Sequence, residues 1–353
     1  MSLLRNNNRF PKYKPLRYEW AYKGYELLQD QHWKAKEISL AQDVVDYHRL
    51  PAKQQNMIKN ILRLFTQNDI EALTGYSALL GSIKPTEVKM WLSAVANTEA
   101  IHIDAYSLLT DTLGFDETFY DEFVEIPVME RKIDFLEKAK AKKYHEYKAL
   151  GLSEADIDKT YRRDVTMMVG VFGGGLEGIE LMAQFALLLA WQELGQFNGM
   201  SQINTYSILD ENIHQIFNSM LYLTLKEENE DVMDEEAINT VRQALIQASQ
   251  QELALIDYLY SDGEHPTVTE GEAKQYVKFM TDRALKMLDL QPHYGVEKNP
   301  LSFMNDILSN VHLANFFEVD VTEYSKNLFT TPLETVDTKR IDWESLHRQT
   351  FSD

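Results

Sequence analysis

Two copies of one short motif, Glu-x-x-His, lie in segments with helical periodicity, at Glu99–His102 and Glu211–His214. Residues three apart on an α-helix are neighbours on one face, so each motif presents a carboxylate and an imidazole to the same point. Asp69 and Glu177 are single carboxylates in two further helical segments. Four carboxylates buried together would have to take up protons unless cations neutralise them, because burial and mutual repulsion both raise carboxyl pKa values. The six side chains therefore predict a dinuclear metal centre.

Nearly the whole chain has the apolar spacing of helices. Only 9 residues are Pro and 15 are Gly, and apolar side chains recur at steps of three and four. Asp69 continues the apolar stripe of Phe65, and Glu99 continues that of Val95, so both carboxylates are expected to point inward. Four long helices are expected at Leu50–Ser77, Pro85–Leu113, Asp164–Leu194 and Gly199–Lys226. Shorter helices are expected at Ser39–Tyr47, Asp116–Leu150, Asp234–Ser261 and Gly271–Leu288. This count fits an all-α fold with a four-helix core and flanking helices.

Composition excludes several function classes. The 353-residue chain has a net charge of -20, which repels nucleic-acid backbones and anionic lipid. It has no cysteine, so disulfides, thiolate ligands and thiol nucleophiles are excluded. No secretory signal is visible at the N-terminus, and the first uncharged run of the most apolar stretch, Val165–Leu176, has only 12 residues, too few to span a bilayer. We expect a cytoplasmic protein that binds neither nucleic acid nor membrane.

Some of these residues have competing interpretations. A third Glu-x-x-His, Glu344–His347, lies in a polar C-terminal segment and is interpreted as a chance match. Glu71 and Glu180 lie close in sequence to Asp69 and Glu177 and could replace them as ligands. Asp69 is preferred because it lies on the apolar stripe.

A run of glycines surrounds Glu177, comprising Gly173, Gly174, Gly175 and Gly178. Missing side chains would leave room for a cluster or a distorted helical turn, and a loop or kink is the alternative. No Gly-Lys-Ser/Thr follows, so the run is not a phosphate loop. Tyr106 lies one turn beyond His102, so its phenol is expected to approach the metals, although a tyrosine on this face also fits core packing.

The sequence resembles the radical-generating small subunit of class I ribonucleotide reductase from about Trp33 to Tyr324. The segments that carry the resemblance are WKAKE at 33–37, TEAIHIDAY at 98–106, LEGI at 176–179, DENIH at 210–214, and NFFE followed by TEYSK within 315–326. Two single-carboxylate helices and two Glu-x-x-His helices are the ligand plan of ferritin-like di-iron and di-manganese proteins. The separation of 30 residues between Asp69 and Glu99 is one fewer than in many members.

The resemblance implies a ferritin-like domain at 1–325 and a flexible tail at 326–353 that docks on the large subunit. It implies a dinuclear centre, with iron first and dimanganese or mixed manganese and iron as alternatives. The implied metal ligands are Asp69, Glu99, His102, Glu177, Glu211 and His214. A homodimer is also implied.

The same resemblance assigns roles in radical chemistry. Tyr106 would hold a stable radical, although some members store the oxidising equivalent on the metals instead. His102, Asp210 and Trp33 would relay it outward, and Tyr324 would carry it to the large subunit, whose cysteine begins the reduction of ribonucleotides to deoxyribonucleotides. The lack of cysteine in this chain fits that division of labour.

Two other functions share these ligands. A di-iron monooxygenase or oxidase of the ferritin-like superfamily would need a substrate cavity near the metals and has no use for a tyrosine-bearing tail. A non-catalytic iron-storage protein has a much shorter subunit as a rule. Both remain alternatives to the reductase subunit at this point.

Overall fold

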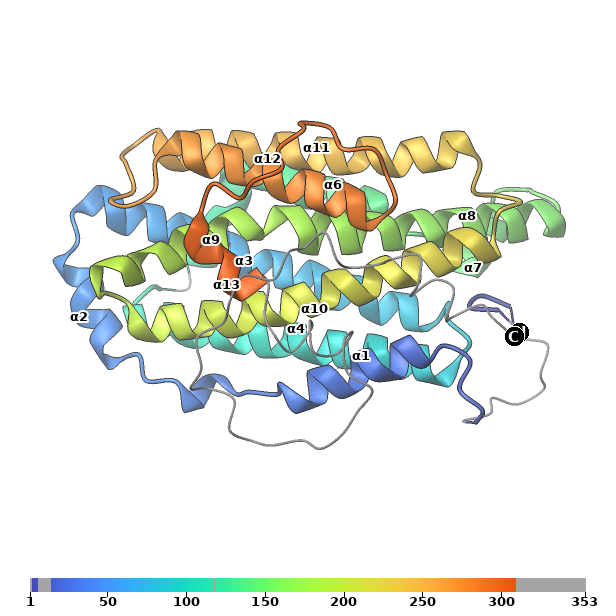
Figure 1. The fold of residues 1–353 in the computed structure, drawn as a ribbon, viewed down its shortest axis with the longest axis horizontal. Coiled ribbons are helices and arrows are strands. Elements are labelled where there is room, and N and C mark those ends of the chain that lie inside the picture. The colour runs from blue at the N-terminus through green and yellow to red at the C-terminus, as the bar shows by residue number, and fades with distance from the viewer. Residues whose placement is uncertain (1, 6–13, 117, 309–353) are drawn as a thin grey trace.

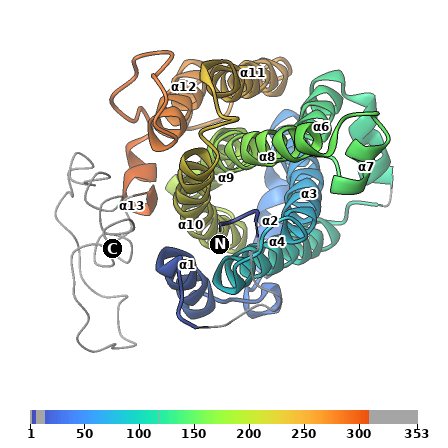
Figure 2. The ribbon, with the colours of Figure 1, turned by 90° about the vertical axis from the view of Figure 1, so that its right-hand side faces the viewer.

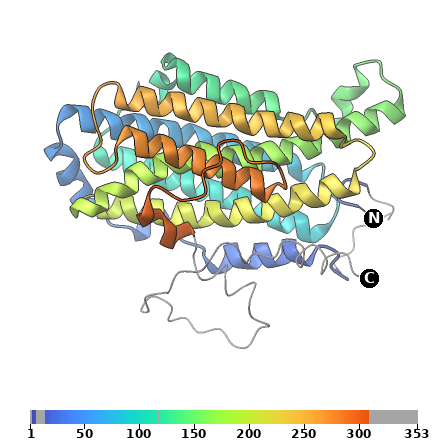
Figure 3. The ribbon, with the colours of Figure 1, turned by 45° about the horizontal axis from the view of Figure 1, so that its top comes forward.

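The computed structural model describes residues 2–5, 14–116 and 118–308, and every element in this part of the chain is a helix. Its long helices run along the long axis of the molecule (Figures 1 and 3). Four rods form the core: α3 (Ala52–Leu80), α4 (Thr86–Leu113), the joined α8 (Glu154–Gly170), η3 (Val171–Glu180) and α9 (Met182–Leu189), and α10 (Asn198–Glu228). Because α3 lies along α4 and α10 contacts both α4 and η3, the predicted four-helix core is confirmed.

Flanking helices cover this core on several sides (Figure 2). Helix α1 (Glu19–Asp30) packs on α4 and α10, whereas α11 (Glu235–Tyr260) and α12 (Glu270–Met287) cover η3. Helix α6 (Pro127–Ala139) packs against α11, and α2 (Ala41–Arg49) contacts α10. The remaining short elements are η1 (Ala35–Glu37), α5 (Thr118–Asp121), η2 (Glu122–Glu125), α7 (Tyr144–Lys148), η4 (Ala190–Leu194), η5 (Ser302–Met304) and α13 (Asn305–Leu308).

The structure corrects one predicted helix and adds another. The single helix expected over Asp116–Leu150 is wrong, because this stretch forms α5, η2, α6 and α7. Pro127 begins α6 after an extended Ile126, and Lys140 ends it with extended backbone, as expected for a residue before proline and for a helix end. Helix α1 was not predicted. Its inward face is narrow, with Trp20, Ala21, Gly24 and Leu28 buried.

The glycine run in the third rod adopts π-helical pitch over Val171–Glu180, so the expected distorted turn is confirmed. A Cβ atom on Gly173 would lie 2.7 Å from the Cβ of Asn218, and one on Gly178 would lie 2.1 Å from Nε2 of Gln215. These glycines therefore allow α10 to approach the π-helix closely.

The segment Glu154–Leu194 is long and apolar enough to cross a membrane, but 94% of its most apolar window is buried inside the fold. The covering elements are α10, α11 and α12. This segment is therefore a core helix of the bundle.

The start of α10 is fixed by side chains of α2. Asp43 accepts hydrogen bonds from the backbone N–H groups of Gly199 and Met200, and Asp46 accepts one from Phe197. Phe197 has a φ of 56°, a conformation that bulky residues rarely adopt. The two carboxylates satisfy N–H groups that the helix itself leaves without acceptors.

A buried histidine links folding stability to pH. Nδ1 of His265 accepts hydrogen bonds from the backbone N–H groups of Thr267 and Val268, at 3.3 and 3.2 Å, so this atom carries no proton. Burial lowers the pKa of His265 to about 4, against about 6.5 in an unfolded chain. Since the folded pKa is the lower one, protons favour the unfolded chain below about pH 6.5, and the loss of stability is complete below about pH 4.

We expect His265 to lower the free energy of unfolding by about 2 kcal/mol between pH 7 and pH 5. The variant His265→Gln keeps a polar side chain but cannot be protonated there, so it should lack this part of the pH dependence. Urea unfolding of both proteins at the two pH values measures the difference. An equal loss of stability in both proteins would contradict the assignment.

Candidate metal centre

All six predicted ligand side chains converge in the middle of the bundle. They form two groups whose donor atoms lie within 4.8 Å of one another, and every member is buried. One group contains Asp69 of α3 with Glu99 and His102 of α4. The other group contains Glu99, Glu177 of η3, and Glu211 and His214 of α10. Glu99 belongs to both groups, so the cluster has room for two neighbouring cations.

Two carboxylates lie between the imidazoles. Glu99 places Oε1 3.1 Å from Nδ1 of His214 and Oε2 3.7 Å from Nδ1 of His102. Glu211 places Oε1 3.2 Å from Nδ1 of His102 and Oε2 3.6 Å from Nδ1 of His214. Each of these glutamates therefore presents one oxygen to each histidine, so both would be available to hold a pair of cations.

The cluster without cations must hold protons. Burial raises the pKa of Asp69 and Glu177 well above the usual range, and the charge of Glu211 adds to the effect. Burial alone would lower the pKa of each histidine, but the surrounding carboxylates raise both well above the usual range. Burial would raise the pKa of Glu99 as it does for the other carboxylates, yet the two neighbouring imidazoles, His102 and His214, hold this pKa at about 2. Cations entering this site would displace those protons.

The donor atoms also fit a metal because they lack other partners. The buried cluster atoms without a hydrogen bond are both oxygens of Asp69, Glu99 and Glu211, Oε1 of Glu177, Nδ1 of His102, and both ring nitrogens of His214. Buried polar atoms almost always have a partner. Carboxylate oxygens with two imidazoles suit iron or manganese, so these residues fit the dinuclear centre that the sequence implies.

The competing carboxylates are engaged elsewhere. Glu71 accepts a hydrogen bond from Nζ of Lys140 at 2.7 Å. Glu180 lies 3.2 Å from Nζ of Lys132, which also pairs with Glu252. Neither glutamate joins the two groups of candidate ligands.

A hydrogen-bonded chain leads away from His102. Its Nε2 lies 3.2 Å from Oδ2 of Asp210, and the same oxygen accepts a hydrogen bond from Nε1 of Trp33 at 2.8 Å. Because Nε2 faces Asp210, Nδ1 is left toward the cluster. The predicted neighbours His102, Asp210 and Trp33 are therefore brought together. The ring of Tyr206 lies 5.4 Å from that of Trp33.

Tyr106 is fully buried beside the cluster. Its hydroxyl donates to Oδ1 of Asn204 at 3.0 Å and lies 3.3 Å from Oγ of Ser207. Its ring packs against the tilted ring of Phe65, with centroids 4.8 Å apart. Burial, followed by the charge of Asp69, raises the pKa of Tyr106 well above its usual value. The phenol is therefore neutral at physiological pH.

Sequence reasoning missed three polar residues of this site, Asn204, Ser207 and Asn218. The signal was present, because these residues alternate with Glu211 and His214 at steps of three and four along α10. All five side chains are buried. A polar stripe of this kind on a buried helix face marks a site.

Some predicted residues lie outside the described part of the chain. These are Tyr324, the segment 315–326, the tail at 326–353 and the third Glu-x-x-His at Glu344–His347. Their roles therefore stay predictions.

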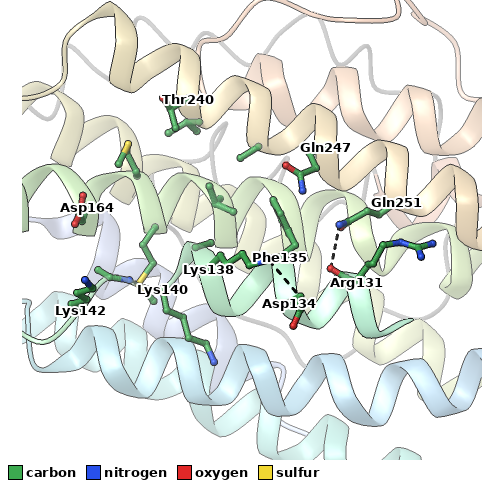
Figure 4. Close-up of a pocket in the computed structure, with 17 residues that line it drawn as sticks. Arg131, Asp134, Phe135, Lys138, Lys140, Lys142, Asp164, Thr240, Gln247 and Gln251 are labelled. Carbon is green, nitrogen blue, oxygen red and sulfur yellow. Dashed lines mark hydrogen bonds and ion pairs between the residues drawn. The ribbon is translucent and has the colours of Figure 1, made fainter. Parts of the chain in front are cut away.

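A cavity of about 580 Å³ opens between α6, α8 and α11, with Phe135, Lys138 and Gln251 in its lining (Figure 4). None of the six clustered residues lines it. This cavity is therefore not the metal-adjacent substrate cavity that the monooxygenase alternative requires.

Comparisons with known proteins agree with the site. The family model for the ribonucleotide reductase small chain matches residues 11–300. The probable ribonucleoside-diphosphate reductase small subunit 048L of Invertebrate iridescent virus 3 is 31% identical over 329 residues, covering 90% of this chain and 85% of the relative. The corresponding 376L protein of Invertebrate iridescent virus 6 is 30% identical over 352 residues, covering 92% and 96%.

Solved structures share the fold. The R2 subunit from Clostridium botulinum has a TM-score of 0.75 at 21% identity, covering 87% of this chain and 94% of that protein. The dimanganese(II)-NrdF protein of Streptococcus sanguinis has a TM-score of 0.65 at 15% identity, covering 86% and 99%. The family match over most of the length shows that the chain belongs to the small subunits of ribonucleoside-diphosphate reductase, the family that its sequence resembles.

Proposed function

We propose that the six clustered side chains would hold two metal ions, and that Tyr106 beside them is the residue oxidised to a radical for use by the large subunit. The observation that carries the proposal is the sharing of Glu99 and Glu211 between the two imidazoles. The donor set suits iron and manganese alike, and iron is the first candidate by the resemblance to the family. Dimanganese, as in the NrdF protein of Streptococcus sanguinis, and a mixed pair are the alternatives.

The protein's own residues prepare Tyr106 for loss of an electron. When bound, a pair of iron or manganese ions supplies the one-electron oxidising power. Tyr106 is shielded from water by its burial, and Asn204 fixes the direction of its O–H group. Because burial and the charge of Asp69 keep the phenol protonated, Tyr106 holds its proton in the hydrogen bond to Oδ1 of Asn204 before it is oxidised.

The chain from His102 through Asp210 to Trp33 is proposed to move the oxidising equivalent toward the surface. Asp210 orients the imidazole, and its Oδ2 atom joins the imidazole to the indole. Tyr324 is proposed to continue the path to the large subunit. The thiol that begins nucleotide reduction must come from that partner, since this chain has no cysteine.

We further propose a cytoplasmic homodimer with the domain at 1–325 and a docking tail at 326–353. The net charge of -20 supports a protein partner over nucleic acid or membrane. The buried position of the one segment apolar enough to cross a membrane, among the residues that the structure describes, also supports this assignment.

Replacing Glu99 by Ala should remove the carboxylate shared by both metal positions. We expect the metal content to fall from about two ions per chain to below about one, because both positions lose a ligand. Metal analysis of protein reconstituted with Fe²⁺ or Mn²⁺ measures the content. Glu71→Gln is the matched control and should retain both ions, because Glu71 pairs with Lys140. Two bound ions in Glu99→Ala would disprove the ligand assignment.

Replacing Tyr106 by Phe should abolish the tyrosyl signal in electron paramagnetic resonance while both metals still bind, because the ring packing on Phe65 is kept. Turnover with the large subunit should fall by at least about 100-fold. Tyr47→Phe alters another buried tyrosine on α2 and should behave as the native protein. An identical radical signal in Tyr106→Phe would locate the radical elsewhere.

Replacing Asp210 by Ala should break the link between His102 and Trp33. Turnover with the large subunit is expected to fall by about 10- to 100-fold, because outer-sphere partners of metal ligands have effects of this size. Nucleotide reduction by the reconstituted complex measures it. Asp104→Ala removes an exposed carboxylate of α4 and serves as the control. Full turnover in Asp210→Ala would refute the relay.

A further inference from the structure

Asn218 makes three hydrogen bonds on the side of the cluster that holds Glu177. Its Nδ2 donates to Oε2 of Glu177 at 3.1 Å and to the hydroxyl oxygen of Tyr76 at 2.9 Å. Its Oδ1 accepts from Nε1 of Trp91 at 3.1 Å. All four side chains are buried, so no bulk water competes for these bonds.

The chemistry of Trp91 fixes the orientation of this amide. An indole N–H can only donate, so the atom of Asn218 that faces Trp91 must be the carbonyl oxygen. The NH₂ group then faces Glu177 and Tyr76, where both of its hydrogens find acceptors. An amide turned the other way would set two donors against each other and leave Glu177 without this hydrogen bond.

The hydrogen bond makes the two oxygens of Glu177 unequal. Oε2 is held by Asn218, whereas Oε1 has no hydrogen bond and lies 3.7 Å from Nδ1 of His214. At the other end of the cluster, both oxygens of Asp69 are without hydrogen bonds. Of these two single carboxylates, only Asp69 therefore has two free oxygens to offer to one cation.

We propose that Asn218 is a positioning residue that holds Oε2 of Glu177, so that Oε1 would be the one oxygen of Glu177 left to bind a metal ion. The inference rests on the proposed dinuclear centre and adds to it a difference between the two oxygens of Glu177. Asn218 acts through Glu177 and does not touch the metals itself.

Packing keeps Asn218 in place. A Cβ atom on residue 173 would lie only 2.7 Å from the Cβ of Asn218. Glycine at position 173 of the π-helix therefore leaves the space that Asn218 occupies. The Trp91 ring that orients the amide also meets the ring of His214 edge-on, with centroids 6.2 Å apart. The same indole thus contacts one metal-ligand candidate directly and another through Asn218.

The test titrates the metal-free full chain with Mn²⁺ under anaerobic conditions, and calorimetry measures the affinity of each binding step. We expect the native protein to bind two ions. Asn218→Leu, which removes the donor and keeps a side chain branched at Cγ, should weaken one binding step by about 10- to 100-fold and leave the other within about twofold. Asn218→Ala should act in the same direction, so that a shared effect reports the lost donor and not the changed volume.

Ser219→Ala is the matched control, because Ser219 is a buried neighbour on α10 whose hydroxyl donates to the backbone oxygen of Gln215 and not to Glu177. It should bind both ions as the native protein does. Thermal unfolding of the metal-free variants, followed by circular dichroism, identifies any variant that does not fold. If only one of Asn218→Leu and Asn218→Ala folds, its metal affinities decide the test.

Infrared spectroscopy gives a readout that general destabilisation would not move. In Mn²⁺-loaded protein with ¹³C-labelled glutamate carboxylates, one-oxygen binding gives widely separated antisymmetric and symmetric stretching bands, whereas chelation brings the bands together. The Asn218 variants should lose widely separated intensity that Ser219→Ala retains. Native-like affinities and bands in the Asn218 variants would overturn the inference alone. Failure of the native protein to bind two ions would instead overturn the proposed centre.

Discussion

The structure depends on keeping four carboxylates and two imidazoles together in a dry core. In this setting charge must be matched locally, because water cannot screen it. Burial raises the pKa of Asp69 and Glu177, and the surrounding carboxylates raise the pKa of both histidines, so that the cluster without cations favours bound protons. The arrangement is thus a poor way to stabilise a bundle and a good way to bind cations, since cations can replace every one of those protons at once.

The fold accommodates this cluster by bringing α10 and the π-helix unusually close. Gly173 and Gly178 leave space for Asn218 and Gln215, and the wider pitch presents Glu177 toward the same interior. The cluster therefore depends on small and polar residues within four positions of Glu177 and His214. In the flanking layer, the buried Lys132 pairs with carboxylates of η3 and α11, which ties those helices together.

Much of this could be predicted from sequence because periodicity and chemistry agreed. Asp69 and Glu99 lie on otherwise apolar helix faces, and the run of glycines around Glu177 indicated the distorted helical turn. What could not be predicted were partners distant in sequence. Lys140 neutralises Glu71 across 69 positions and Asn218 holds Glu177 across 41, and no local pattern encodes such pairs. Two breaks in the helix expected over Asp116–Leu150 were missed. Pro127 gave a clear signal for the start of α6, whereas no strong signal marks its end at Lys140.

The contact between α2 and the start of α10 fixes the position from which α10 carries its site residues. Asp43 and Asp46 accept hydrogen bonds from backbone N–H groups at the start of α10. These bonds fix the rotation of the helix about its axis, and with it the direction in which every later side chain points. Each residue advances the helix by about 1.5 Å and turns it by about 100°. Inserting one amino acid between Met200 and Asn204 would therefore turn the whole polar stripe of α10 away from the interior while the hydrogen bonds to Asp43 and Asp46 stay in place.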